Sequence, residues 1–243
     1  METVVKKLEE LLLEGENPPP VEWQLRAILS EQCLSYVAWN TRAREAVLID
    51  PKVEDTKTYF ELAKTLEGYV WLGVIDTHTH ADHVSSAAEV ASRLQAPLVM
   101  HEAAMTAKAQ ILVRSDCQLP SHAAPLQIIV TPGHTPDSLT PIWGPFLFGG
   151  DTILFGDTGR DDLPGGDPEA HYRSVQAIKA VAKPSMILLP GHDHKFGRAS
   201  SWAKQLEVNA SLTQSHEDFV REASAFDAPP PAKLKESLRK NFK

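Results

Sequence analysis

The sequence predicts an α/β layered domain, because short apolar runs that suit β-strands alternate with helical patterns along most of the chain. With 243 residues, 42% of them hydrophobic and 23% charged, the chain is large and apolar enough to bury one sizeable core. Several apolar runs also stop just before a histidine or an aspartate, in the way that strands deliver side chains to a sheet edge. We therefore expect a main domain at residues 21–220, an N-terminal helical extension at 1–20 and a C-terminal helical tail at 221–243.

Composition limits the partners of the chain. The net charge of −8 argues against a nucleic-acid groove, which needs a basic stripe. No run approaches the ~18 apolar residues of a membrane-spanning helix, and the acidic residues near the N-terminus suit neither a signal peptide nor a transit peptide. The two cysteines, Cys33 and Cys117, cannot form a disulfide framework and receive no role. We expect a cytoplasmic protein with no nucleic-acid or membrane partner.

The first third of the chain combines one helix with several strands. Residues 1–16 have the apolar spacing of a short helix, which Gly15 and the following prolines end. This helix could pack on a partner subunit, so a homodimer is one expected assembly. The further elements expected here are strands at 33–39 and 45–49 around a turn at 40–44, a helix at 54–67 and a buried strand at 69–75.

The rest of the chain alternates helices and strands more regularly. We expect helices at 84–94, 102–112 and 168–182, and strands at 96–100, 127–130, 146–148 and 186–189. From residue 200 the pattern is helical to the end, interrupted by Pro229-Pro230-Pro231.

One segment carries most of the chemical information. His78, His80, Asp82 and His83 fall within six consecutive residues, directly after the predicted strand at 69–75. Imidazole and carboxylate are ligand types that suit zinc, iron and manganese. A solvated polar loop is the alternative explanation, and it is disfavoured because other strand ends supply matching side chains.

Three further strand ends each present a potential ligand. His134 and His192 both follow Pro-Gly, and Asp151 follows Gly-Gly. Glycine allows the sharp turn and the close backbone approach that such a position needs. A single histidine of this kind is weak evidence, whereas four strand ends of the same kind predict one shared metal site.

This set of residues resembles that of the metallo-β-lactamase superfamily, over residues 30–220. The resemblance implies an αββα sandwich of two mixed sheets with helices on the outer faces and the metal site at the edge between the sheets. For a binuclear hydrolase of that superfamily it implies a first metal on His78, His80 and His134, a second on Asp82, His83 and His192, and Asp151 as the bridge.

Two thiol-handling families of that superfamily compete. One is glyoxalase II, and the other is persulfide dioxygenase. The segments 159–163, 192–194 and 209–213 are more similar to the dioxygenase. Four residues of this sequence differ from those that the persulfide dioxygenase pattern has at the same positions: Asp157, Leu163, His194 and Ala210. These differences lie around the substrate rather than on the metal. The resemblance implies an enzyme that oxidises glutathione persulfide, or a similar thiol persulfide, with O₂ to sulfite and free thiol.

The two families differ in metal content. The dioxygenase resemblance implies one Fe²⁺ per chain on His78, His134 and Asp151, the facial arrangement of non-haem iron oxygenases. The other residues of the set, His80, Asp82, His83 and His192, would then form an outer shell. The hydrolase alternative, acting on glutathione thioesters, implies two Zn²⁺ per chain and a catalytic Asp82 that orients the bridging hydroxide. A metal-binding protein without turnover is a minor alternative, which the complete ligand set disfavours.

Two residues are candidates for substrate binding. The guanidinium of Arg160 matches the geometry of a glutathione carboxylate, although a salt bridge to Asp161, Asp162 or Asp167 is an equal alternative. Tyr172 matches a tyrosine of the related enzymes, with packing as its alternative. The histidines without a motif are expected to be structural or superficial: His101, His122, His171 and His216.

Overall fold

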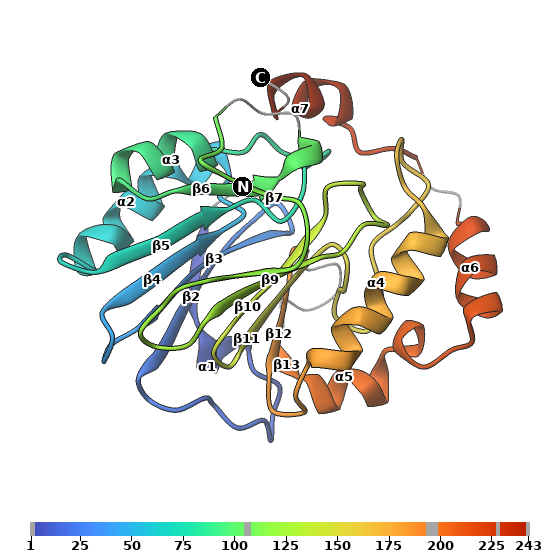
Figure 1. Cartoon of the computed structure of the whole chain (residues 1–243), viewed down its shortest axis with the longest axis horizontal. Coiled ribbons are helices and arrows are strands. Elements are labelled where there is room, and N and C mark those ends of the chain that lie inside the picture. Colours follow the sequence, from blue (N-terminus) through green and yellow to red (C-terminus); the bar gives the residue numbers. More distant parts are fainter. Residues whose placement is uncertain (1–2, 105–107, 193–198, 227–228, 242–243) are drawn as a thin grey trace.

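Two β-sheets lie face to face, and helices cover the outer side of each (Figure 1). The computed structural model describes residues 3–104, 108–192, 199–226 and 229–241. Helices α2 and α3 cover one sheet, and α4, α5 and α6 lie on the side of the other. The αββα sandwich predicted from the sequence is confirmed.

The first sheet has seven strands in chain order, β1 to β7. The first four pair antiparallel and the last four pair parallel, with α2 and α3 as crossovers. Its strands are β1 (Val4–Lys7), β2 (Trp23–Ser30), β3 (Cys33–Asn40), β4 (Glu45–Ile49), β5 (Val70–Ile75), β6 (Leu98–His101) and β7 (Ile111–Val113).

The second sheet has six strands in the order β13-β12-β11-β10-β9-β8. Only β11 and β12 pair parallel, joined by the long helix α4. Its strands are β8 (Cys117–Leu119), β9 (Leu126–Val130), β10 (Leu139–Trp143), β11 (Phe146–Gly150), β12 (Ile187–Pro190) and β13 (Ser200–Ser201).

The helices are mostly short and are held by tertiary packing. The longest begins at Pro168, and the side chain of Asp167 caps it by accepting a hydrogen bond from the backbone N–H of Ala170 (3.1 Å). The α-helices are α1 (Leu8–Leu11), α2 (Thr56–Thr65), α3 (Ala87–Leu94), α4 (Pro168–Val181), α5 (Trp202–Val208), α6 (His216–Ser224) and α7 (Leu234–Asn241). Short 3₁₀ turns lie at Val53–Asp55, Glu102–Ala104 and Ala210–Leu212.

The main core lies between the sheets. Trp143, Phe146 and Phe148 are fully buried there, and the ring of Trp23 meets Trp143 edge to face with centroids 4.9 Å apart. Two smaller clusters fill the spaces under α2 and α3 and under α4 to α6. Because both sheets are anchored to this core, the loops that follow their strands are held at fixed positions.

Backbone hydrogen bonds join the two sheets where the predicted metal ligands emerge. The N–H of Leu139, at the start of β10, donates to the carbonyl of Thr77 after β5 (2.7 Å). The N–H of Leu34 in β3 donates to the carbonyl of Gly191 after β12 (2.8 Å). The loops after strands of both sheets therefore meet at one edge of the sandwich.

Most predicted strands and helices are confirmed, but two segments are wrong. The expected helix at 1–16 is helical only at α1, and Val4–Lys7 pairs antiparallel with β2, from Val4 opposite Leu29 to Lys7 opposite Arg26. Pairing with an available sheet edge outweighs the helical spacing of this short segment. In the described part of the expected helix at 102–112, which leaves out 105–107, a 3₁₀ turn is followed by strand β7.

Strand β10 was not expected, and its apolar run contains Pro141. Its ladder to β11 begins only at Ile142, so the proline lies where no partner on that side needs its missing N–H. Within the described ranges, no helix combines the length and apolar character needed to span a bilayer.

Glu45 offers a test of the packing between the two sheets. Its buried carboxylate accepts hydrogen bonds from Ser121 Oγ (2.6 Å) and from the backbone N–H groups of His122 (2.9 Å) and Ala123 (3.1 Å). Burial alone would raise the pKa of Glu45, but these donors hold it below its ordinary value. We expect Glu45→Ala to lower the free energy of unfolding by about 2 kcal/mol, because the donors lose a charged acceptor.

The same contact predicts a pH dependence. Since the folded pKa is lowered, the stabilisation is present above the unfolded pKa and is lost as the pH falls through the folded pKa. Urea unfolding of the wild type, Glu45→Ala and Glu45→Gln at several pH values checks both points. Equal stability of wild type and Glu45→Ala at pH 7 would show that the contact contributes nothing.

Candidate metal centre

The loop that carries the histidine cluster follows β5 and is held by Asp50 at the end of β4. The backbone N–H of Thr77 donates to Asp50 Oδ1 (2.6 Å), and the Thr77 hydroxyl donates to Asp50 Oδ2 (2.8 Å). Asp50 has a left-handed backbone (φ +51°), which aspartate tolerates better than most residues. In this loop His78, His80 and His83 are all at least 97% buried, since their exposed fractions are 2%, 2% and 3%.

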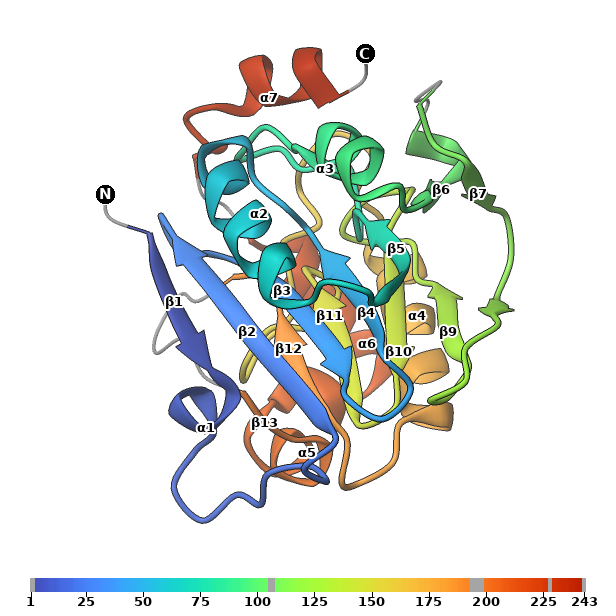
Figure 2. The same ribbon diagram turned by 90° about the vertical axis from the view of Figure 1, so that its left-hand side faces the viewer.

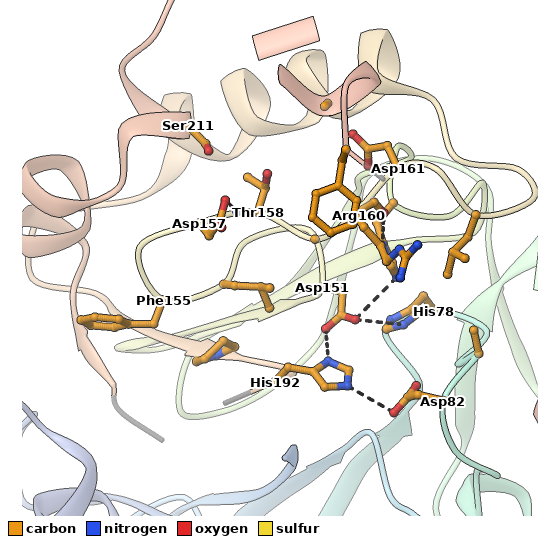
Figure 3. A pocket seen from close by; sticks show the side chains of 18 of the residues that line it. His78, Asp82, Asp151, Phe155, Asp157, Thr158, Arg160, Asp161, His192 and Ser211 are labelled. Carbon is orange, nitrogen blue, oxygen red and sulfur yellow. Dashed lines mark hydrogen bonds and ion pairs between the residues drawn. The ribbon is translucent and has the colours of Figure 1, made fainter. Parts of the chain in front are cut away.

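The structure brings the predicted primary ligands to one point. One ligand atom each of His78, His134 and Asp151 lies within 4.8 Å of the other two, and all three residues are buried. Asp151 Oδ2 is 3.9 Å from Nε2 of His78 and 3.5 Å from Nε2 of His134. Figure 3 shows Asp151 at the centre of this arrangement, between His78 and His192.

Hydrogen bonds fix which ring nitrogens are available to a metal. The Thr77 hydroxyl uses its hydrogen on Asp50, so its oxygen accepts from Nδ1–H of His78 (3.0 Å). Nδ1 of His134 likewise donates to the backbone carbonyl of Arg160 (2.7 Å). In a neutral imidazole the lone pair then lies on Nε2, which faces Asp151 in both residues.

The charge states suit a divalent cation. Burial, with the neighbouring His80, lowers the pKa of His78 well below its ordinary value, so this imidazole is neutral. Burial alone would raise the pKa of Asp151, but the surrounding imidazoles, His192 first, hold it below its ordinary value. Two imidazole nitrogens and one carboxylate oxygen therefore form a donor set that fits iron, zinc or manganese.

His80 lies next to His78 but faces another partner. The two ring centroids are 4.1 Å apart, yet Nε2 of His80 is directed at Asp50 Oδ1 (3.2 Å). Burial alone would lower the pKa of His80, but the carboxylate of Asp50 raises it to about 9. His80 is therefore ion-paired with Asp50 and not part of the converging set around Asp151.

Asp82 and His192 form a second network beside the first. Both ring nitrogens of His192 face carboxylates, Nδ1 towards Asp151 Oδ1 (2.7 Å) and Nε2 towards Asp82 Oδ2 (3.2 Å), as Figure 3 shows. Burial opposes the charged form of His192, but these carboxylates raise its pKa well above the ordinary value. His192 thus bridges the two aspartates as a hydrogen-bond donor.

Asp82 also contacts two further potential ligands. Its Oδ2 is 3.0 Å from Nδ1 of His83 and 2.9 Å from the thiol of Cys33, which lies just after the β2–β3 turn. Cys33, Asp82 and His83 form a second group whose ligand atoms lie within 4.8 Å of one another. Nε2 of His83 and Nδ1 of His80 are buried without a hydrogen-bond partner in the described part of the chain.

A cavity of about 730 Å³ opens onto the metal-ligand residues. His78, His134 and Asp151 line it, together with Cys33 and His192. Apolar side chains from several segments form much of the remaining wall: Leu154, Phe155, Leu163, Phe219, Phe226 and Pro231. Its size is in the range of cavities that bind small molecules.

The two predicted substrate residues differ in their positions. Arg160 lines the cavity, but its guanidinium forms a two-point ion pair with Asp162 (2.6 and 2.5 Å) and donates to the carbonyl of Pro229 (2.9 Å). Tyr172 is not among the residues that line the cavity. Its ring projects from α4 and packs on His216 and Phe219 of α6.

The histidines without a motif lie outside the converging set, as expected. His171 is fully buried, with Nδ1 facing Asp161 (2.6 Å) and Nε2 donating to the carbonyl of Thr152 (2.7 Å). His216 forms an exposed pair with Glu169. The backbone N–H of His122 donates to Glu45, and Nδ1 of His101 accepts from the N–H of Ala103.

Sequence analysis missed several residues that shape this site. Asp50 could have been found, because it follows the apolar run of β4 directly, as the predicted ligands follow theirs. Asp137 accepts hydrogen bonds from the backbone and the side chain of Thr79. Neither Asp137 nor Cys33 directly follows a predicted apolar strand, so the sequence did not indicate them. The departure at His194 lies outside the described residues.

Comparisons with known proteins identify relatives of this chain. Residues 30–116 match the family model of the metallo-beta-lactamase superfamily. Persulfide dioxygenase ETHE1, mitochondrial, from Bos taurus is 28% identical over 211 residues, covering 86% of this chain and 83% of its own length. The same protein from Homo sapiens is 27% identical over the same shares.

Solved structures extend the likeness to three dimensions. The crystal structure of ETHE1 from Myxococcus xanthus matches with a TM-score of 0.82 and 27% identity, over 90% of this chain and 97% of that one. A metallo-beta-lactamase from Staphylococcus aureus has the same fold, with a TM-score of 0.77 at 22% identity, over 90% of this chain and 72% of that one. Residues 30–116 therefore match the metallo-beta-lactamase family model, the chain shares the fold of these solved structures, and proteins named persulfide dioxygenase are among its relatives.

Proposed function

We propose that this protein is a persulfide dioxygenase that holds one Fe²⁺ per chain on His78, His134 and Asp151. The observation that carries the proposal is the convergence of these three ligand atoms within 4.8 Å, while His80 faces Asp50 instead. Two histidines and one carboxylate on one face of a metal leave positions open for substrates. The homologues named persulfide dioxygenase support the same chemistry.

The bound iron would supply the electron exchange between a persulfide sulfur and O₂. Overall, one persulfide, one O₂ and one water give sulfite, the free thiol and two protons. The chain's own residues supply the geometry. Thr77 and the Arg160 carbonyl orient the imidazoles of His78 and His134. His192 holds Asp151 through a 2.7 Å contact, and Asp82 holds His192 in turn.

The substrate would be a small thiol persulfide, glutathione persulfide or a similar carrier, in the cavity of about 730 Å³. Arg160 stands in the cavity wall, where it could receive a carboxylate of the carrier. That role competes with the ion pair to Asp162, so the carrier would share the guanidinium with this aspartate.

A binuclear zinc hydrolase of glutathione thioesters is the second candidate. The observation in its favour is the group formed by Cys33, Asp82 and His83, together with the unpartnered Nε2 of His83 in the described structure. In that enzyme Asp82 would orient the attacking hydroxide. Against it, both ring nitrogens of His192 already face carboxylates.

The cellular setting is also part of the proposal. Cys33 and Cys117 are both free thiols, which suits a reducing compartment such as the cytoplasm. The homodimer remains a prediction, as does the division of the chain at residues 20 and 220.

Metal analysis of protein purified without added metal, combined with O₂-electrode assays, separates the two candidates. We expect one iron per chain and O₂ uptake with glutathione persulfide. Two zinc ions per chain, no O₂ uptake and rapid cleavage of a glutathione thioester would overturn the dioxygenase proposal and support the hydrolase.

Paired substitutions test the assignment of the ligands. His134→Ala removes a ligand of the proposed iron site, so we expect iron content and O₂ uptake to fall at least about 10-fold. His83→Ala changes only the neighbouring group and should retain one iron per chain. Equal loss of metal from both variants, measured by elemental analysis, would indicate a binuclear site.

Thr77 provides a finer test, because it contacts His78 rather than the metal. Thr77→Val removes the hydroxyl that accepts from Nδ1–H of His78 and donates to Asp50. We expect a loss of about 10–100-fold in iron affinity, measured by competition with a ferrous chelator. Thr77→Ser keeps the hydroxyl and should bind iron as the wild type does; a valine variant that also does so would exclude the orienting role.

A further inference from the structure

The C-terminal part of the chain reaches the cavity described above. We call Phe226 and residues 229–241 the C-terminal strap. Phe226 and Pro231 line the cavity, and the Phe226 ring lies under the guanidinium of Arg160, 5.2 Å from it. The carbonyl of Pro229 accepts a hydrogen bond from the same guanidinium (2.9 Å). The strap is therefore one wall of the site rather than a detached tail.

The strap continues along the rim towards the histidine loop. Lys233 forms an ion pair with Glu31 (2.9 Å), which lies in the β2–β3 turn next to Cys33. Both side chains are more than 40% exposed, so this pair adds little stability. The ion pair instead helps to position the chain, because it holds the residue before α7 next to Glu31, which lines the cavity.

Helix α7 carries one inward face. Leu234, Ser237, Leu238 and Asn241 are buried or half-buried, at the spacing of one helical stripe, while the charged residues between them are exposed. In Figure 2 the helix lies beyond α2 and α3 at the upper end of the molecule. The stripe ends at Asn241, which is the residue that meets the histidine loop.

The side-chain amide of Asn241 uses three of its hydrogen-bonding positions on the backbone of that loop. Its Nδ2 donates to the carbonyls of His80 (2.9 Å) and His83 (2.9 Å), and its Oδ1 accepts from the N–H of Ser85 (3.0 Å). The segment 78–83 has no helix or strand to pair its backbone groups. One side chain from the far end of the sequence thus takes the place of regular secondary structure.

From these contacts we infer that Asn241 is a positioning residue of the metal centre. It fixes the backbone on either side of Asp82, whose carboxylate contacts His192 (3.2 Å). His192 in turn contacts Asp151 (2.7 Å), the proposed iron ligand. The inference rests on the proposed function only for the identity of the metal, since the hydrogen bonds to the loop hold for either metal content.

Three variants of the full-length protein test the role of Asn241. Asn241→Ala removes all three hydrogen bonds, and Asn241→Asp keeps the shape and the acceptor but cannot donate to the two carbonyls. Lys240→Ala is the matched control on the same helix, because its exposed pair with Glu236 does not touch the loop.

The measurements are hydrogen exchange of the amides at 78–86 and the rate at which a chromogenic chelator removes Fe²⁺. For both Asn241 variants we expect faster exchange, about 10-fold faster loss of iron and a lower kcat for O₂ uptake at unchanged KM. Lys240→Ala should match the wild type. If the Asn241 variants match Lys240→Ala in exchange and iron release, the inference is overturned.

The outcome is separable from that of the proposed function. Exchange and metal release do not depend on which reaction the protein performs. Faster exchange and metal loss in a protein that takes up no O₂ would support the role of Asn241 and contradict the dioxygenase. Full O₂ uptake with unchanged exchange and iron release in both variants would support the dioxygenase and contradict the role of Asn241.

Discussion

The contact between the Asp50 carboxylate and Thr77 is the constraint on which the rest of the site depends. It joins the ends of two parallel strands, because Asp50 follows β4 and Thr77 follows β5. The carbonyl of Thr77 also accepts the N–H of Leu139, so the second sheet is tied to the same point. Through the Thr77 hydroxyl the carboxylate sets the tautomer of His78, and directly it holds His80 in an ion pair. One buried acid thus supports two neighbouring histidines in different ways, through a hydroxyl for His78 and by direct pairing for His80.

The positions of the candidate ligands could be predicted because each ligand segment follows an apolar strand, and the end of an apolar run can be recognised in the sequence. The same reasoning predicted strands β3 to β6, β9, β11 and β12, but not the remaining strands of the two sheets. It failed at Val4–Lys7, where pairing with β2 outweighs helical spacing, and at β10, where Pro141 is tolerated because the ladder to β11 starts one residue later. Residues such as Asn241 could not be found, since their partners lie far away in the sequence and only the folded chain brings them together.

The imidazoles of the site differ in what their ring nitrogens contact. Nε2 of His78 and of His134 face Asp151, while His192 bridges Asp151 and Asp82 with both ring nitrogens. Because both of its ring nitrogens face carboxylates, His192 is unavailable as a ligand in this arrangement. The same seven residues that a binuclear enzyme would use can in this way surround one metal. What distinguishes the mononuclear from the binuclear arrangement is the pairing of His80 with Asp50 and of His83 with Asp82. A count of potential ligands does not reveal these pairs.

The most direct test of this account is the X-ray absorption spectrum of the iron-loaded protein, prepared without oxygen. A single iron on His78, His134 and Asp151 predicts scattering from two imidazole rings and no metal–metal signal. A metal–metal distance of about 3.5–4 Å, together with scattering from more than two imidazoles per metal on average, would contradict the mononuclear centre and with it the proposed dioxygenase.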